Sequence, residues 1–121
     1  MPTTHDQGRR FEEAAARHLA DQGWQVLARN VRVARKEVDL VVRRGDLVAF
    51  VEVKGRTGRG YGHPLEAITW KKRREIAFVA RCWIERFGEP CLSYRFDAVA
   101  VEQGSDGGLA VEHVPDAWRL P

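Results

Sequence analysis

The first regular pattern of apolar residues runs from about Arg10 to Gln22. Its apolar residues recur three or four positions apart, as on one face of a helix. They are Phe11, Ala15, Ala16 and Leu19. Gly23 follows directly, and glycine is common where a helix ends. The pattern therefore predicts an amphipathic helix over residues 10–22.

A second, longer helical pattern begins at about Leu65 or Thr69 and ends at Phe87. Its apolar residues again gather on one side of a helix. They are Ile76, Val79, Ala80, Trp83, Ile84 and Phe87. Gly88 and Pro90 come next, and neither residue favours continuing a helix. These positions predict one long amphipathic helix.

The remaining segments with a clear pattern resemble strands, because they are rich in β-branched and aromatic residues or alternate apolar with polar positions. They are Trp24–Val33, Glu37–Arg43, Leu47–Lys54, Leu92–Glu102 and Leu109–Val114. The turn Arg44-Gly45-Asp46 joins the second to the third, a basic glycine-punctuated loop at Gly55–His63 follows, and residues 103–108 form the last turn. This order (αβββαββ) predicts an α/β fold in which helices cover a mixed sheet.

Length and composition indicate one folded domain over residues 1–121, with 44% hydrophobic and 31% charged residues. The longest unbroken aliphatic and aromatic run, Leu47–Val51, is far shorter than the ~20 residues of a membrane span. Cys82 and Cys91 lie in no CxxC pair, and the N-terminus has no apolar stretch typical of a secretory signal. We therefore expect a cytoplasmic protein without a membrane partner.

Positive charge is concentrated in the middle of the chain. The formal net charge is only +3, but residues 54–86 hold nine Lys and Arg against three Asp and Glu. Such a concentration favours a surface that attracts phosphate groups. The alternative is that the many arginines only reflect the base composition of the genome.

The predicted hairpin of residues 37–43 and 47–54 carries the strongest chemical signal. Side chains alternate between the two faces of a strand. A two- or four-residue turn puts Asp39 beside Glu52, opposite or diagonal at about 5–8 Å, with Lys54 one step along the same face. The other face then carries only apolar residues, which a three-residue turn would mix with charged ones. They are Val38, Leu40, Val42, Leu47, Ala49, Val51 and Val53.

Two neighbouring carboxylates repel each other unless a cation lies between them. Oxygen ligands without His or Cys select a hard ion such as Mg²⁺ (or Mn²⁺). Lys54 would then orient, or help to deprotonate, a water that attacks phosphorus. The alternative is a surface trio that forms weak, exposed ion pairs. The four histidines have no metal-ligand spacing, which disfavours zinc.

The segments EVDLV (Glu37–Val41) and FVEVKGR (Phe50–Arg56) resemble the D…(D/E)xK core of restriction-endonuclease-like nucleases, a superfamily that includes Holliday-junction resolvases. More narrowly, residues 8–102 resemble the YraN-like family of uncharacterised endonuclease-like proteins. Further positions also fit this family: Gly8, Glu12, Ala15, Leu19, Gly23, Asn30, Arg32, Thr69, Lys72, Arg95 and Asp97. Lys36 departs from it, because members often carry glycine there, and this puts the local turn geometry in question.

The resemblance implies a restriction-endonuclease-like fold and an Mg-dependent (or Mn-dependent) endonuclease that cuts nucleic-acid phosphodiester bonds, with branched or structured DNA as one substrate class. It implies that Asp39, Glu52 and the Val53 carbonyl bind the metal and that Lys54 is the catalytic lysine. Glu12 would be an accessory acid that completes or orients the metal shell. From its position alone, beside Glu13 and opposite Phe11, Glu12 is more simply interpreted as a solvated helix residue.

A basic surface would bind the nucleic-acid backbone. The residues expected there are Arg56, Arg59, Lys71, Lys72 and Arg73. The alternative for the helical residues is an ordinary solvated face. Trp70 and Tyr61 are candidates for stacking on a base, although packing against the sheet is the stronger expectation for Trp70. Arg95 and Asp97 share one face of a strand and are expected to form a structural pair.

Two other functions remain open at this point. One is a non-catalytic nucleic-acid-binding or adaptor protein that keeps the nuclease fold. It would bind DNA in a salt-sensitive manner without need of Mg²⁺. The other is a nuclease that is silent without a partner. Resemblance to resolvases makes a homodimer the oligomeric state to test.

Overall fold

The computed structural model describes residues 3–58 and 62–120. Its elements follow the predicted order, with one additional short 3₁₀ helix, η1, before the second long helix. They are α1 (Thr4–Asp21), β1 (Gln25–Val33), β2 (Lys36–Arg44), β3 (Leu47–Thr57), η1 (Pro64–Ala67), α2 (Trp70–Phe87), β4 (Ser93–Gln103) and β5 (Leu109–Trp118). Within the described ranges, no helix combines the length and the apolar character that crossing a membrane requires.

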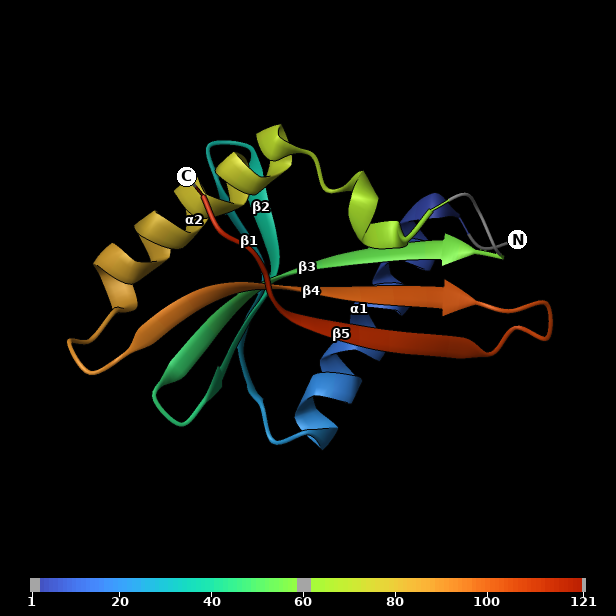
Figure 1. Cartoon of the computed structure of the whole chain (residues 1–121), viewed down its shortest axis with the longest axis horizontal. Helices are drawn as coiled ribbons and strands as arrows, with labels where there is room; N and C mark the ends of the chain where they lie inside the picture. The colour runs from blue at the N-terminus through green and yellow to red at the C-terminus, as the bar shows by residue number, and fades with distance from the viewer. Residues whose placement is uncertain (1–2, 59–61, 121) are drawn as a thin grey trace.

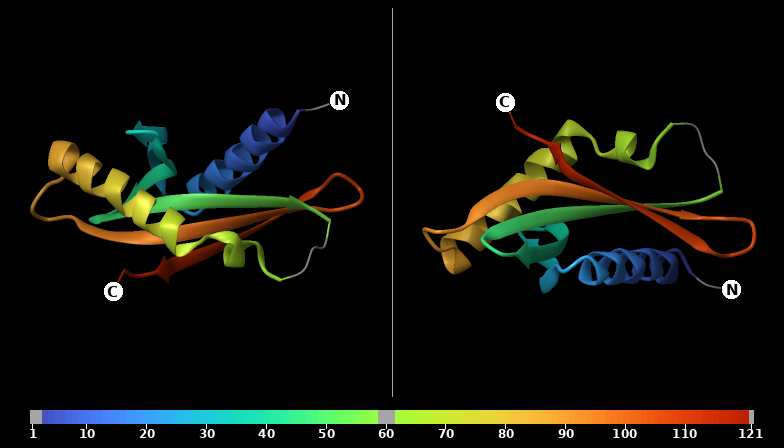
Figure 2. Two further views of the ribbon diagram at one scale, coloured as in Figure 1. Left: turned by 90° about the horizontal axis from the view of Figure 1, so that it is seen from above. Right: turned by 60° about the horizontal axis from the view of Figure 1, so that its bottom comes forward.

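The five strands form one sheet in the order β1-β2-β3-β4-β5 (Figure 1). The β3–β4 pair is parallel, and the other three pairs are antiparallel. The two long helices cover opposite faces of this sheet, as Figure 2 shows in its right-hand view. The predicted fold class, a mixed sheet flanked by helices as in restriction-endonuclease-like proteins, is confirmed.

Helix α1 begins six residues earlier than predicted. Thr3 caps it: its hydroxyl accepts a hydrogen bond from the Asp6 backbone N–H at 3.1 Å, and the Asp6 carboxylate accepts one from the Thr3 backbone N–H at 3.2 Å. This reciprocal capping box satisfies free backbone groups of the first turn. Apolar periodicity could not reveal that turn, because its side chains are polar and mostly exposed.

Helix α2 begins at Trp70, so Thr69 and not Leu65 marks its start. The Thr69 hydroxyl accepts a hydrogen bond from the Lys72 backbone N–H at 3.1 Å, which is the usual bond of an N-cap. Leu65 belongs to η1. Four residues of the predicted apolar side of α2, Ile76, Val79, Ala80 and Trp83, are fully or largely shielded. Phe87, at the last position of the helix, was expected on this side but is 54% exposed.

Each face of the sheet has its own apolar core. On the α1 side, buried residues of the helix pack on those of the strands: Phe11, Ala15, Ala16, Leu19, Trp24, Leu40, Val42, Ala49, Val51, Val99 and Val101. The α2 side has a second set: Val38, Val41, Val48, Phe50, Ile68, Ile76, Val79, Ala80, Trp83, Ala98 and Trp118. Burial on both faces fixes the strand register, because a slip of one residue would exchange the two sets.

Strand β3 is longer than predicted and runs through residues 55–57, which the sequence pattern assigned to a loop. Gly55 lies where α1 crosses β3, and a Cβ at this position would overlap the ring of Phe11. The glycine therefore serves close helix–strand packing rather than a turn. This packing brings the N-terminal half of α1 down onto the end of β3.

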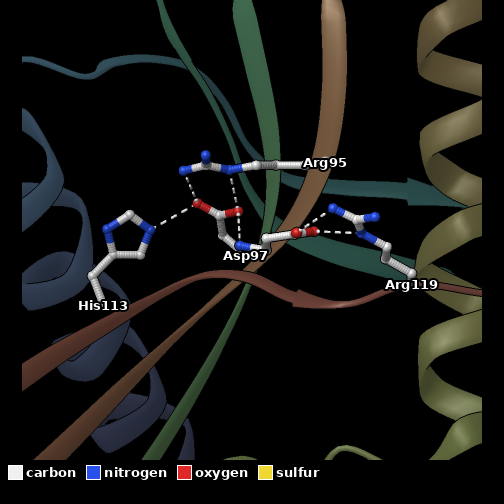
Figure 3. A network of polar contacts seen from close by, with 5 residues as sticks. Arg95, Asp97, His113 and Arg119 are labelled. Carbon is white, nitrogen blue, oxygen red and sulfur yellow. Dashed lines mark hydrogen bonds and ion pairs between the residues drawn. The ribbon is translucent and has the colours of Figure 1, made fainter.

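Arg95 and Asp97 form the predicted structural pair, within a larger network (Figure 3). The buried Asp97 carboxylate accepts hydrogen bonds from Arg95 Nε at 2.7 Å and from the Asp116 backbone N–H at 3.0 Å, and lies 2.7 Å from His113 Nε2. Burial alone would raise the pKa of Asp97, but the hydrogen bonds from His113 and Arg95 outweigh burial and lower it.

Replacing Gly55 should weaken the packing of α1. We expect Gly55→Ala to lower the free energy of unfolding by about 1–3 kcal/mol, because the new methyl group overpacks a filled contact. Gly8→Ala is the control: it lies in α1 with open space around it, and should stabilise the helix slightly. Urea unfolding of both variants measures the difference. Equal effects would contradict the close-packing role of Gly55.

Removing the charge of Asp97 should be far more damaging. Asp97→Asn leaves Arg95 and His113 without their buried partner, and loss of one member of a buried pair costs about 3–5 kcal/mol. Asp116→Asn is the matched control, because the Asp116 carboxylate pairs with Arg119 at the surface and should matter little. Urea midpoints that fall equally in both variants would contradict this reading of the network.

Candidate active site

The pairing of β2 with β3 brings the two predicted carboxylates together. Paired residues run from Arg44 opposite Leu47 to Leu40 opposite Val51, with a two-residue turn at Gly45-Asp46. Continuing this register by one position sets Asp39 opposite Glu52. The predicted neighbours are thus confirmed, and the turn has one of the two lengths, two or four residues, that the apolar pattern allowed.

The two strands part immediately beyond this point. Regular pairing ends at Leu40, and the Val53 backbone N–H donates instead to Asp39 Oδ2 at 2.7 Å. Val38 packs in the α2-side core while Leu40 and Val42 lie in the α1-side core. The prediction that Val38 shares a face with Leu40 and Val42 is therefore wrong, because strict alternation fails where β2 turns away from β3.

Glu52 lies almost completely buried beside Asp39, with 2% of its surface exposed. Burial first, and then the hydrogen bond and charge of Asp39, raise the pKa of Glu52 to about 9. Lys72 of α2 counteracts this shift from one side, with its Nζ atom 3.8 Å from Glu52 Oε2. Lys54 of β3 opposes it from the strand itself.

Glu12 and Glu37 extend the acidic group from α1 and β2. One carboxylate oxygen from each of Glu12, Glu37 and Asp39 lies within 4.8 Å of the others. Burial, followed by repulsion from Asp39 and Glu37, raises the pKa of Glu12. Glu12 thus faces other acids, in contrast to the solvated position that its sequence neighbours allowed.

Asn30 of β1 binds two of these acids through its side-chain amide. With its amide nitrogen turned toward them, the side chain donates to Glu12 Oε1 and to Glu37 Oε1, each at 3.0 Å. Its backbone has a positive φ of 50°, which asparagine tolerates better than most residues. A neutral donor therefore separates like charges in the part of the site that lies away from the lysines.

These elements enclose a cavity of about 300 Å³. It is lined by residues from α1, β2, β3 and α2: Gly8, Phe11, Glu12, Asp39, Glu52, Val53, Lys54 and Lys72. The predicted catalytic residues Glu12, Asp39, Glu52 and Lys54 all lie on its wall. The arrangement offers carboxylate oxygens for a hard cation and ammonium groups for an anion, side by side.

The Val53 carbonyl also belongs to this opening. In an antiparallel ladder, the N–H and C=O of one residue point to the same neighbouring strand. The Val53 N–H points to Asp39, so the carbonyl of the same residue is directed toward the side from which β2 has withdrawn. A backbone oxygen is thereby available next to the carboxylates.

The residues predicted to bind nucleic acid lie in different surroundings. Lys72 lines the cavity, Lys71 is exposed beside it on α2, and Arg73 donates to the Ile68 carbonyl at 3.0 Å. Arg56 Nη2 pairs with Glu102 Oε1 at 2.9 Å. Arg59 lies outside the described residues.

Trp70 is 51% exposed at the start of α2, with the Arg73 guanidinium 4.7 Å from its ring centroid, rather than buried against the sheet. Tyr61, the other candidate for stacking on a base, lies outside the described residues. Trp70 is therefore left on the surface beside basic residues, where a base can reach its ring.

Sequence reasoning did not assign Asn30, Glu37 or the cavity-side position of Lys72. A signal existed for each: Asn30 and Lys72 are among the positions that fit the family, and Glu37 begins the EVDLV segment. Their convergence depends on the parting of the strands and on the tilt of α2, which no local pattern encodes.

Comparisons with known proteins identify similar sequences. The model of the Uncharacterised protein family UPF0102 matches residues 11–101. The UPF0102 protein STH1475 of Symbiobacterium thermophilum is 42% identical over 112 residues, covering 93% of this chain and 95% of that protein. The UPF0102 protein RHA1_ro06551 of Rhodococcus jostii is 42% identical over 111 residues, covering 92% and 94%. The UPF0102 protein CT2262 of Chlorobaculum tepidum is 37% identical over 118 residues, covering 93% and 92%.

Glu52 should make the protein less stable as pH rises. In the unfolded chain this carboxyl titrates near its ordinary value of 4.5, whereas in the folded protein its pKa is about 9. A raised folded-state pKa contributes stability in full below about 4.5, and the contribution is lost as pH rises toward 9. The stability of Glu52→Gln relative to the natural protein should therefore increase between about pH 5 and about pH 8.

Urea titrations at the two pH values measure this change. Glu85→Gln, which alters an exposed glutamate of α2, is the control and should show a nearly constant difference. A Glu52→Gln difference that is equally constant would show that Glu52 titrates normally in the folded protein.

Proposed function

Since this chain belongs to the Uncharacterised protein family UPF0102, we propose that it is a divalent-metal-dependent endonuclease that hydrolyses phosphodiester bonds in DNA. The observation that carries the proposal is the convergence of Glu12, Asp39, Glu52 and Lys54 on one cavity. Structured DNA such as junctions and flaps is the substrate class to compare with duplex and single strands. We place the activity in the cytoplasm, with a homodimer as the form that could cut two strands.

The residues of the cavity fit a hard divalent cation. The donors are oxygens only, from Asp39, Glu52 and the Val53 carbonyl, which suits Mg²⁺ or Mn²⁺. The buried Glu52 has a pKa raised to about 9, so the two neighbouring lysines do not balance the cost of its charge. A divalent ion would supply the missing positive charge.

When bound, such an ion supplies Lewis-acid stabilisation of phosphate charge and a more acidic water. The protein's own residues have separate tasks. Lys54 positions the attacking water or the phosphate oxygen beside the carboxylates. Glu12, which extends from α1, orients the neighbouring carboxylates. Lys72, which extends from α2, holds the Glu52 carboxylate, with its Nζ atom 3.8 Å from Glu52 Oε2. Because all four side chains extend from helices or strands, the site needs little rearrangement before substrate binds.

Basic residues near the cavity support a nucleic-acid substrate. Lys71 and Lys72 lie in the first turn of α2, and Arg73 follows beside the half-exposed Trp70. Lysine and arginine contacts of this kind bind phosphates without reading sequence, while an exposed aromatic ring can stack on an unpaired base. Arg56 is engaged with Glu102, so we assign it a supporting role at the edge of this surface.

The decisive test compares Asp39→Ala with Asp46→Ala. Both remove an aspartate of the same hairpin, but Asp46 lies in the exposed turn. With Mg²⁺ and duplex, junction, flap or single-stranded DNA, Asp39→Ala should lower the cleavage rate by at least about 100-fold, as expected for loss of a major electrostatic contribution. Asp46→Ala should cleave at the natural rate.

A second readout is independent of cleavage. Mg²⁺ should raise the unfolding temperature of the natural protein and of Asp46→Ala, but not that of Asp39→Ala. Cleavage that survives Asp39→Ala would refute the proposed site. DNA binding that ignores Mg²⁺, with no cleavage of any substrate and no Mg²⁺ effect on unfolding, would favour the non-catalytic adaptor instead.

A further inference from the structure

A second cavity, of about 330 Å³, lies at the opposite end of α1 from the acidic site. It is lined by His18, Gln22, Trp24, Arg44, Arg95, His113 and Pro115, and none of these is acidic. Gln22 is ten residues beyond Glu12 along α1, which corresponds to about 15 Å of helix. We propose that this cavity binds a phosphate monoester group.

The basic side chains of the cavity contact the ring of Trp24. Its indole ring is 3% exposed, and the guanidinium carbons of Arg44 and Arg95 lie 4.5 Å and 5.5 Å from the ring centroid. His113 meets the same ring edge-on at 6.2 Å. Cation–π attraction thus places both guanidinium groups over the ring of one buried tryptophan.

Among the residues that the structure describes, one buried carboxylate lies against these cations. Asp97 binds Arg95 through Nε and Nη2 and lies against His113 Nε2, as Figure 3 shows. These bonds fix the orientation of Arg95 and His113. Arg44 Nη1 donates to the Gln22 carbonyl at 3.2 Å, and no carboxylate of the described residues pairs with Arg44. The charge of one guanidinium is therefore left for a ligand.

The same tryptophan carries a buried donor without a partner. Trp24 Nε1 is buried and has no hydrogen-bond partner among the described residues. An unpaired buried N–H costs free energy, which an incoming oxygen ligand would recover. Arg95 and His113 already bind the Asp97 carboxylate, which leaves the Arg44 guanidinium as the charged donor of the cavity. A lining of arginine, histidine and tryptophan without an acid favours an anion with several oxygens.

The chemistry favours a phosphate monoester over a smaller anion. Arginine forks match phosphate oxygens bidentately, and the Arg44 guanidinium, which no carboxylate of the described residues neutralises, leaves a positive charge for such a group. The cavity could hold about ten waters, so the group attached to the phosphate has room to enter. The ligand is either a small phosphorylated molecule or the phosphorylated end of a nucleic-acid strand. Its binding uses no residue of the acidic site.

The test is calorimetry on the full chain without divalent ions, using inorganic phosphate and a dinucleotide with and without a 5′-phosphate. Arg44→Gln should weaken phosphate binding by about 10-fold or more, as for a lost charge-assisted bond. Arg43→Gln is the matched control: it removes the same charge from the next residue, which alternation places on the other face of β2. It should bind phosphate like the natural protein.

Three outcomes decide the proposal. Failure of the natural protein to bind phosphate, or equal weakening in both variants, overturns it. Preference for the 5′-phosphorylated dinucleotide, lost only in Arg44→Gln and competed by inorganic phosphate, supports a nucleic-acid end. Phosphate binding that is lost in Arg44→Gln, with dinucleotide binding indifferent to the 5′-phosphate, supports a small phosphorylated molecule.

A spectroscopic measurement needs no variant at the arginines. Phosphate should shift the NMR resonance of the Trp24 indole N–H and leave that of Trp83, in the α2-side core, unchanged. A Trp24 signal that does not move while phosphate binds would place the ligand elsewhere and overturn the assignment.

Discussion

The hydrogen bond from the Val53 backbone N–H to the Asp39 carboxylate is the contact on which the acidic site depends. Strands β2 and β3 pair regularly only up to Leu40 and Val51, and beyond this point β3 loses its antiparallel neighbour. An unpaired N–H at such a partly buried position would be costly. Asp39 satisfies it at 2.7 Å with a side chain, so the backbones can separate without that cost. The separation opens the cavity that receives α1 and α2 side chains.

The site brings together carboxyl groups whose mutual repulsion disfavours the folded state. Glu52 is buried next to Asp39, and Glu12 and Glu37 add two more carboxyls within reach. The protein reduces the repulsion with Asn30 between two of the acids and with Lys72 near a third. This reduction of the repulsion is incomplete, because the pKa values of Glu52 and Glu12 are still raised. A local free-energy cost that nothing nearby offsets, in an otherwise well-packed fold, is typical of a functional site.

Most of the fold was predictable because burial leaves a periodic trace in the sequence. The order of elements and the pairing of Asp39 with Glu52 followed from that trace and from the two-residue turn. Side-chain capping at Thr3 and the extension of β3 through Gly55 leave no apolar period, so both were missed. Val38 was misplaced for a tertiary reason, since β2 stays paired with β1 but parts from β3 at the very residue whose side chain binds β3.

The rigidity of the frame determines how the acidic group can be neutralised. Asp39 and Glu52 extend from paired strands, and α1 is fixed against β3 by the contact of Phe11 with Gly55. The carboxyls therefore cannot move apart to relieve their repulsion, and relief must come from a bound proton or a bound cation. Burial and the neighbouring Asp39 raise the pKa of Glu52, which favours its protonated form when no divalent ion is present. Under the proposed function, a divalent ion must displace that proton, so metal binding and proton release are one coupled step.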